Sequence, residues 1–309
     1  MSRQKSEDFI ASSYLHPRFW PMWLMFAFLR AAALLPYRSQ LGLGKTVGRI
    51  IKFASKKRQA IVDINLQHCF PDKSLSERNR IKHDCYENIG IGLLEMAMCW
   101  WWSEKRLRPL VEVHGLEHIK NTLDQGRGVI LLSGHFTSLE LGGRLLTLFQ
   151  PFQAMYRVQK NALFDSFLYH KRNEYLVDTV SRKDTRKLIK GIRKQIPTWY
   201  APDQDFGRER NVFVPFMGVT TATISASTRL AQASGAAMLP FYPERKRDGS
   251  GYVLTIEAPL DNFPGGDDHE DASRINESIE TFVRKHPDQY MWVHKRFKTR
   301  PPGEPAFYE

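Results

Sequence analysis

The chain has 309 residues, of which 42% are hydrophobic and 25% charged, a composition typical of a globular protein with one large α/β core or two modest domains. Its 45 Lys and Arg outnumber its 33 Asp and Glu, and the net charge of +12 favours anionic partners: phospholipid headgroups, phosphorylated sugars, nucleic acid or an acidic carrier protein. The cysteines, Cys69, Cys85 and Cys99, form no CxxC pair, which argues against a disulfide framework and a thiolate zinc site.

Residues 19–35 form the one strongly apolar run, which one proline and one arginine interrupt. At about 17 residues the run is at the short end for a membrane-spanning helix. No small-residue cleavage site closes it before Pro36, which disfavours a cleaved signal peptide. Trp20 and Trp23 suit an interfacial aromatic belt, so the run predicts an uncleaved membrane anchor. The alternative is a buried core helix with a solvated basic face.

Basic side chains follow this apolar run closely: Arg38, Lys45, Arg49, Lys52, Lys56, Lys57 and Arg58. Positive charge beside an anchor is retained on the cytoplasmic side and attracted to anionic lipid, so we expect the body of the protein to face the cytoplasm. No internal repeat or linker divides the rest of the sequence. The simplest division is an N-terminal tail and membrane-anchor helix, 1–40, and a single domain, 41–309.

The next segment, from Ser74 to Trp102, has a helical apolar spacing and reads as one or two packed helices. From there strands and helices alternate. The predicted strands are 129–132, 198–202, 212–216, 237–242 and 252–257, and the predicted helices are about 136–148, 161–176, 184–195, 223–234 and 272–285. Alternation of this kind predicts an α/β fold with a mixed, largely parallel central sheet flanked by helices, and a ligand site at the carboxyl ends of the strands.

His135 lies at such a strand end, in the segment HFTSLE, and Glu140 follows about one helical turn later. A Glu140 carboxylate that accepts the Nδ1 proton of His135 would fix the tautomer and make Nε2 a base for a hydroxyl nucleophile. This arrangement is the orienting half of a Ser-His-Asp triad, with the hydroxyl of the substrate in place of serine. The spacing H-x4-E also occurs often by chance, in which case His135 is a solvated histidine beside a surface glutamate.

The segment HFTSLE resembles the H-x4-D/E block of the glycerolipid and lipid A acyltransferases. Further segments agree with that family in order: YRVQKNALFD at 156–165, WYAPDQDFG at 199–207, VFVPFMG at 212–218 and MLPFYPERK at 238–246. The segments NLQHCFPDKS at 65–74 and QYMWVHKRFKTRPPGEP at 289–305 resemble the late acyltransferases of lipid A biosynthesis, specifically the lauroyltransferase group. This resemblance covers nearly the whole chain from residue 15.

The resemblance implies a glycerolipid acyltransferase-like fold and transfer of a secondary acyl chain, usually laurate, from acyl carrier protein to a hydroxyl of a Kdo-bearing tetra-acylated lipid A precursor. It implies no metal or organic cofactor, and it places the enzyme at the anionic inner membrane with its catalytic domain on the cytoplasmic side. By position, His135 is the general base and Glu140 its orienting partner.

The resemblance also selects three further polar residues. Arg172 and Asp203 match positions that the family needs for activity, and Arg157 lies in the block where related acyltransferases bind the phosphate of the acceptor. A cationic Arg172 can hold a phosphate or stabilise developing negative charge, although an arginine in the run HKR is also a common helix-surface residue. Asp203 is also favoured in a turn for local reasons.

Two other classes compete with the acyltransferase interpretation. A basic nucleic-acid-binding protein would show salt-dependent binding to DNA or RNA, but it leaves the apolar anchor unexplained, so we expect no nucleic-acid partner. A lipase-like hydrolase needs its own nucleophile, and around Ser234 the first glycine of a GxSxG elbow is replaced by Gln232. The sequence contains no HExxH motif, so it predicts no metal site.

Overall fold

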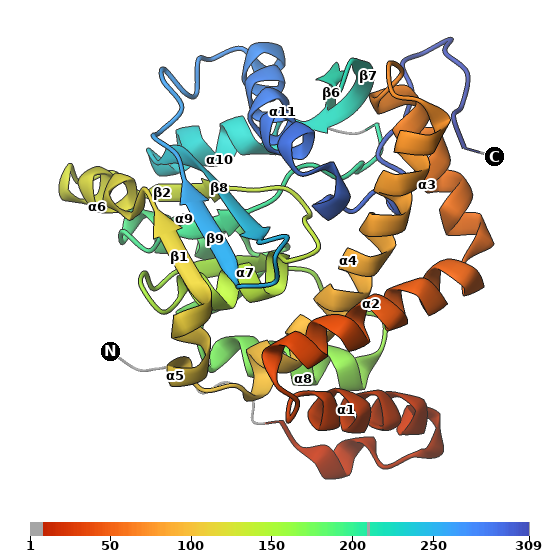
Figure 1. The fold of residues 1–309 in the computed structure, drawn as a ribbon. Coiled ribbons are helices and arrows are strands. Elements are labelled where there is room, and N and C mark those ends of the chain that lie inside the picture. The colour runs from red at the N-terminus through yellow and green to blue at the C-terminus, as the bar shows by residue number, and fades with distance from the viewer. Residues whose placement is uncertain (1–8, 209–210, 309) are drawn as a thin grey trace.

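A seven-stranded sheet runs through the computed structural model, which describes residues 9–208 and 211–308. The strand order is β1-β9-β8-β2-β5-β3-β4 (Figure 1). The strands are β1 (Val111–His114), β2 (Val129–Leu132), β3 (Gln153–Tyr156), β4 (Asp178–Ser181), β5 (Thr198–Tyr200), β8 (Ala237–Arg245) and β9 (Tyr252–Ile256). All neighbours pair in parallel except β8 and β9. The predicted mixed, largely parallel sheet is therefore confirmed.

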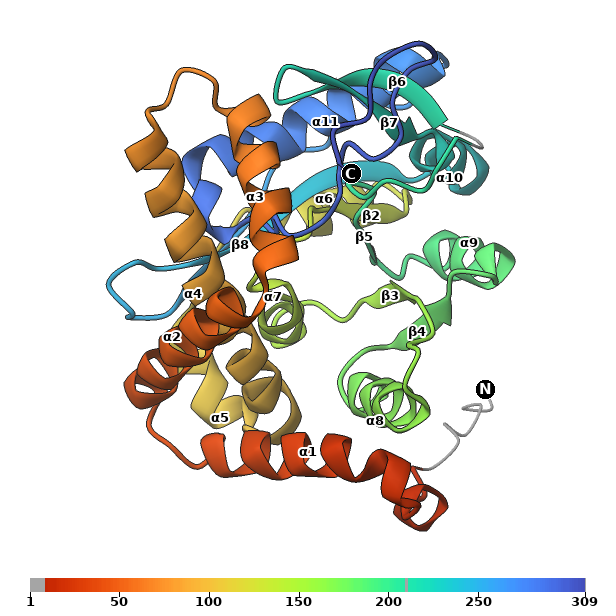
Figure 2. The same ribbon diagram turned by 90° about the vertical axis from the view of Figure 1, so that its right-hand side faces the viewer.

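Helices cover both faces of this sheet (Figures 1 and 2). They are α1 (Trp20–Ala32), α2 (Tyr37–Ala54), α3 (Lys56–Cys69), α4 (Leu75–Trp101), α5 (Glu104–Leu107), α6 (Leu116–Asp124), α7 (Leu139–Leu146), α8 (Ala162–Asn173), α9 (Thr185–Arg193), α10 (Ala226–Ser234) and α11 (Asp268–Lys285). A separate antiparallel hairpin consists of β6 (Asn211–Phe216) and β7 (Val219–Ile224).

The central strand β2 shows why an uninterrupted apolar run suits this position. All of its side chains are completely buried. Val129 and Leu131 belong to an apolar cluster with α1, α4, α7 and α8, whereas Ile130 and Leu132 belong to a second cluster with α3, α9, α10 and α11. Successive side chains of a strand point to opposite faces, so a strand with helices on both faces needs apolar residues at every position.

Helix α4 is one continuous helix, which begins in a capping box where Ser74 and Glu77 bond each other's backbone N–H groups. Helix α2 crosses it at glycines. A Cβ atom on Gly48 would lie 2.1 Å from the carbonyl oxygen of Tyr86, and one on Gly90 would lie 2.2 Å from the carbonyl oxygen of Gly44. The two helix backbones therefore touch directly, and no larger residue fits at the crossing.

The structure differs from the sequence prediction at several elements. Strand β7 occupies the start of the helix predicted at 223–234, and β3 and β4 were not predicted. Helix α7 begins at Leu139 rather than near residue 136, because Phe136 instead forms a β-bridge with Tyr290. That bridge depends on a contact between residues about half of the chain apart, which local periodicity does not encode.

The apolar run at 19–35 is not one long helix. Helix α1 has 13 residues, about 20 Å of rise against the roughly 30 Å of a bilayer core. Within residues 9–208 and 211–308, no helix combines the length and apolarity needed to cross a membrane, so the expected transmembrane helix is not supported. One face of α1, with Phe26, Leu29 and Ala32, is buried in the apolar cluster below the sheet. The division at residue 40 stays a prediction, and residues 1–8 lie outside the described residues.

The α2–α4 crossing gives a stability prediction. Gly48→Ala should lower the free energy of unfolding by about 1–3 kcal/mol, because the new methyl group overlaps the α4 backbone. Gly42→Ala is the matched control, since a Cβ there meets nothing within 4 Å and alanine favours a helix by about 1 kcal/mol over glycine. Urea unfolding measures both variants. A Gly48→Ala protein as stable as Gly42→Ala would contradict the crossing.

Candidate active site

The loop between β2 and α7 carries His135 at the carboxyl end of the central strand. The loop is fixed at both ends by backbone hydrogen bonds. Ser133 N donates to Tyr200 O at 2.9 Å on β5, and Thr137 N donates to Gln289 O at 2.8 Å. The imidazole is thereby held between the sheet and the segment that follows α11. This is the edge of the sheet at which a ligand site was predicted.

Asp203 is the partner of His135. Its Oδ1 lies 2.5 Å from His135 Nδ1, and its Oδ2 accepts the backbone N–H of His135 at 2.8 Å. The hydroxyl of Tyr290 donates to the same Oδ2 at 2.9 Å. The Asp203 side chain is 1% exposed and that of His135 is 25% exposed. The carboxylate is thus enclosed and fully bonded, while the imidazole reaches solvent.

The pair has mutually shifted pKa values. Burial lowers the pKa of His135, but the charge of Asp203 and the hydrogen bond to it raise that pKa by more, so it lies above the ordinary 6.5. Burial raises the pKa of Asp203, but the charge and hydrogen bonds of His135 and Tyr290 hold it well below its usual range. Asp203 therefore stays ionised and fixes Nδ1 as the N–H nitrogen, which leaves Nε2 as the basic atom.

The sequence predicts that Glu140 orients His135, but in this structure Glu140 does not bond His135. Residues 135–138 are not helical, so Glu140, in the first turn of α7, does not stand one helical turn above the imidazole. Its carboxylate instead accepts hydrogen bonds from Arg172 Nε, at 2.9 Å, and from Arg172 Nη2. The hydroxyl of Tyr175 donates a third bond to it at 3.1 Å.

The Glu140–Arg172 ion pair is itself largely buried, with side chains 16% and 19% exposed. Burial raises the pKa of Glu140, but the charge and hydrogen bonds of Arg172 bring it below its ordinary value. Arg172 and Glu140 border a narrow apolar cavity of about 40 Å³, together with Phe152, Leu176 and Trp199. The structure therefore places a fixed guanidinium beside an apolar slot, rather than on a solvated helix surface.

Arg157 lies apart from both pairs. It directly follows β3, its side chain is exposed, and its guanidinium forms no ion pair with any residue of the described chain. Of the predicted site residues, the structure brings together His135 with Asp203, and Glu140 with Arg172, and leaves Arg157 at the neighbouring strand end.

Sequence reasoning missed two residues of the site, Tyr290 and His294. The His294 ring meets the His135 ring at a centroid distance of 5.9 Å and an angle of 72°. Burial, followed by the charge of His135, lowers the pKa of His294 to about 4, so this second imidazole is neutral. Both residues belong to the closing block at 289–305, which resembles the family as a block and by itself assigns no role to either residue.

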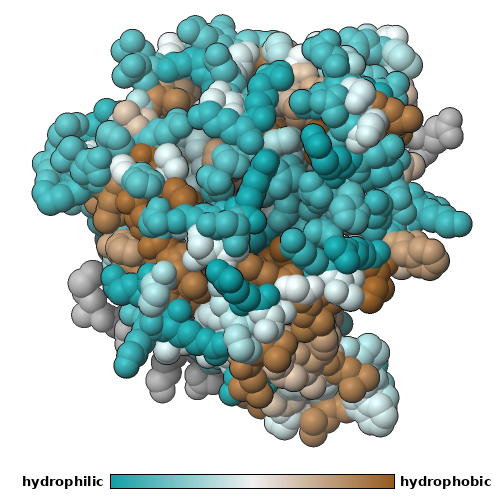
Figure 3. Space-filling model, viewed as in Figure 1, coloured by the Kyte–Doolittle hydropathy of each residue, from teal (hydrophilic) through white to brown (hydrophobic). Residues whose placement is uncertain are grey.

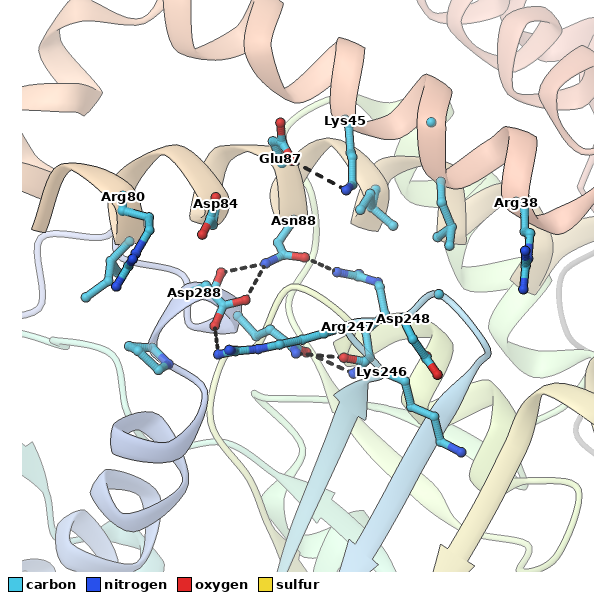
Figure 4. Close-up of a pocket in the computed structure, with 18 of the residues that line it drawn as sticks. Arg38, Lys45, Arg80, Asp84, Glu87, Asn88, Lys246, Arg247, Asp248 and Asp288 are labelled. Carbon is cyan, nitrogen blue, oxygen red and sulfur yellow. Dashed lines mark hydrogen bonds and ion pairs between the residues drawn. The ribbon is translucent and has the colours of Figure 1, made fainter. Parts of the chain in front are cut away.

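A larger cleft of about 850 Å³ lies between α2, α4 and the β8–β9 turn (Figure 4). Arg38 and Arg80 stand at opposite ends of it. It contains none of the predicted site residues, and much of its charge is paired, as in Arg247 with Asp288 at 3.2 Å. On its α4 wall, His83, Asp84 and Glu87 have the spacing of cation ligands, but Glu87 already bonds Arg49 at 2.7 Å. We assign neither feature a part in the reaction.

Residues 9–299 match the family model described as "Bacterial lipid A biosynthesis acyltransferase". The chain belongs to this family. It is therefore an acyltransferase, and its family acylates lipid A during biosynthesis.

Known members of the lipid A acyltransferase family align along nearly the whole chain. The lipid A biosynthesis lauroyltransferase of Escherichia coli (strain K12) is 38% identical over 299 residues, which cover 96% of this chain and 98% of that protein. The palmitoleoyltransferase of the same strain is 37% identical over 296 residues and 96% of each chain. Because two enzymes named for different acyl chains are almost equally similar, identity does not select the acyl chain.

A solved structure also aligns with this chain. It is the 1-acyl-sn-glycerophosphate acyltransferase of Thermotoga maritima, 16% identical, and the alignment covers 82% of this chain and 99% of that one with a TM-score of 0.38.

The two carboxylates are distinguished by a pH profile. A base must be neutral, so kcat/KM of the native enzyme should fall as the pH drops through the raised pKa of His135, above 6.5. Asp203→Asn removes the carboxylate that raises this pKa, so the acid limb should move to lower pH while kcat falls roughly 10²- to 10⁴-fold. Glu140→Gln should leave the midpoint of the acid limb unchanged. If Glu140→Gln shifted the midpoint as far as Asp203→Asn does, Glu140 would be the partner of His135.

Proposed function

We propose that this enzyme transfers a fatty acyl chain, laurate by resemblance, from acyl carrier protein to a hydroxyl of a Kdo-bearing tetra-acylated lipid A precursor. The observation that carries the proposal is the His135–Asp203 pair, in which an enclosed carboxylate bonds Nδ1 of an imidazole that is 25% exposed. This arrangement suits removal of a proton from a hydroxyl, and the family supplies the substrate class.

In the proposed reaction, His135 Nε2 takes the proton of the acceptor hydroxyl while the hydroxyl oxygen attacks the carbonyl carbon of the thioester. The C–O bond forms, and the tetrahedral intermediate then expels the carrier thiolate as the C–S bond breaks. The imidazolium returns its proton to the thiolate, which yields an ester and a free thiol. Asp203 stays ionised and stabilises the imidazolium, as the aspartate of a Ser-His-Asp triad does. This scheme uses no metal or organic cofactor.

Glu140 takes a different part from the one that the sequence suggested. We propose that it holds Arg172, so that the guanidinium is fixed toward substrate rather than free on the surface. A buried ion pair that loses one partner leaves an uncompensated charge, at a cost of about 3–5 kcal/mol, so neither residue is replaceable alone. Arg157, exposed and unpaired within the described chain at the end of β3, remains the proposed contact for a phosphate of the acceptor.

We propose that the enzyme works at the cytoplasmic surface of the inner membrane and that α1 lies in the lipid interface. Trp20, Leu24 and Phe28, each four residues from the next, are 60%, 72% and 44% exposed on one side of α1. Figure 3 shows apolar surface gathered at the α1 end of the molecule. Arg18 and Arg30 are exposed beside it, which is the composition of an interfacial helix on anionic lipid.

Acyl transfer is tested with purified enzyme, the lipid A precursor and acyl carrier protein loaded with chains of several lengths. Mass spectrometry should show addition of one acyl group, fastest with laurate. His135→Ala should reduce the rate at least roughly 10²-fold, because it removes the base. It should also lower the melting temperature, because the enclosed Asp203 carboxylate loses its ring partner. No acyl gain with any chain length in the native enzyme would refute the proposed reaction.

Membrane association is tested by flotation with vesicles that contain anionic phospholipid. The variant Trp20→Ser/Leu24→Ser/Phe28→Ser should bind at least roughly tenfold more weakly, because each side chain loses about 1.5–3 kcal/mol of burial in lipid. Leu75→Ser, which changes another 68% exposed residue at the start of α4, is the control and should bind like the native enzyme. Equal binding by the triple variant would rule out α1 as the contact.

A further inference from the structure

A cavity of about 230 Å³ lies next to the catalytic pair, where α2 and α3 meet at Ser55. Helix α4 and the segment after α11 complete its wall. Its lining includes Ile51, Arg58, Ile89 and His294, and it contains no acidic side chain. One guanidinium among uncharged groups makes the cavity suitable for an anion.

The cavity borders the reaction centre through His294, whose ring lies edge-on to His135 at a centroid distance of 5.9 Å. Arg58 and His294 line the same cavity, and the positive charge of Arg58 contributes to the lowered pKa of His294. Gln204, which directly follows Asp203, lies 3.4 Å from His294 Nε2. Only the His294 ring would therefore separate a ligand group in the cavity from the His135 imidazole.

The wall formed by the segment after α11 is held in place by α3. Buried Asn65 donates to Trp292 O at 2.7 Å and to His294 O at 2.9 Å. Arg58 Nη1 donates to Val293 O at 2.9 Å and forms no ion pair within the described residues. The guanidinium is thus positioned by one hydrogen bond, and its remaining N–H groups are available to a ligand.

The surroundings of the cavity indicate an amphiphilic ligand. Ile50 and Phe53, on the last turns of α2 beside the lining residues Ile51 and Ser55, are 62% and 86% exposed. Exposed apolar side chains next to a cationic cavity match a molecule that carries both an oxyanion and hydrocarbon chains. Of the two substrates in the proposed reaction, the glycolipid acceptor has this character at its sugar.

We infer that the Arg58 cavity binds a sugar-borne oxyanion, a phosphate or a carboxylate, of the acceptor glycolipid and so brings the acceptor hydroxyl to His135. This inference rests on the proposed function. Arg58 is a binding residue in this scheme, and the neutral His294 separates the bound anion from the imidazolium that forms during the reaction.

The test compares Arg58→Ala, Arg58→Lys and the control Lys57→Ala, which removes an equal charge from the exposed neighbouring position of α3. Arg58→Ala should raise the acceptor KM roughly 10- to 100-fold, the effect of losing a charge-assisted hydrogen bond, and leave the donor KM unchanged. Arg58→Lys should recover part of the loss. Lys57→Ala should leave both constants within about twofold, as expected for an exposed, unpaired charge.

Two modified acceptors identify the anion, one without phosphates and one without acidic sugars. With the acceptor that lacks the bound anion, native enzyme and Arg58→Ala should have the same KM, raised above that of native enzyme with the intact acceptor. If Arg58→Ala instead caused only a structural defect, its KM would exceed that of native enzyme for every acceptor. A raised donor KM, equal effects of Lys57→Ala and Arg58→Ala, or a loss from Arg58→Ala that persists with both modified acceptors would overturn the inference.

A binding measurement separates this inference from the proposed reaction. The binding of the detergent-dispersed precursor to His135→Ala, without donor, is compared with its binding to His135→Ala/Arg58→Ala. The double variant should bind roughly tenfold or more weakly. If the double variant binds the precursor as tightly as His135→Ala, the cavity assignment is overturned even if acyl transfer is established. If native enzyme transfers no acyl group but binding still depends on Arg58, the proposed reaction is refuted and the binding site stands.

Discussion

The carboxylate of Asp203 joins three parts of the chain that meet only in the folded protein. It accepts the backbone and ring N–H groups of His135 from the loop after β2, and it accepts the hydroxyl of Tyr290 from the segment after α11. An ionised carboxylate in an enclosed site is costly unless its oxygens are bonded. The same bonds that meet this requirement fix the position and tautomer of the imidazole, so the stability of the loop and its chemistry depend on one interaction.

Glu140 is the second carboxylate of the site, and its partner is a guanidinium instead of an imidazole. Its bonds to Arg172 and Tyr175 hold a guanidinium beside the apolar slot between α7, β3 and α8. The site thus contains two acidic groups whose partners differ, an imidazole for one and a guanidinium for the other. The first partner can exchange a proton near neutral pH and the second cannot. In the proposed reaction, the imidazole therefore transfers the proton and the guanidinium binds or stabilises negative charge.

The helices around the sheet place these groups by close backbone contact. Helix α4 touches α2 at Gly48 and Gly90, and a Cβ on its Gly92 would lie 2.4 Å from Thr137 O in the loop that carries His135. The loop therefore lies between the sheet and a helix that α2 supports from the other side. Since α3 continues from α2 and binds the segment with His294, a displacement of this helical layer would also displace the Arg58 cavity.

The sequence by itself determined the features that depend on neighbours along the chain. The apolar run at 129–132 predicted a buried strand with the bounds of β2, and the segment around Ser74 predicted the start of α4. His135 at the end of that strand followed from the same pattern, and the ordered blocks around it indicated the acyltransferase family. These inferences needed only periodicity, capping and local motifs.

Only the tertiary structure decided which carboxylate meets His135. Spacing favoured Glu140, five residues away, but the bridge from Phe136 to Tyr290 keeps residues 135–138 out of the helix. Asp203 reaches the imidazole because β2 and β5 are parallel neighbours, which places the turns after Leu132 and Tyr200 side by side. Strand order and long-range bridges are set by packing of the whole chain, and for that reason sequence spacing identified the residues of the site but not their pairing.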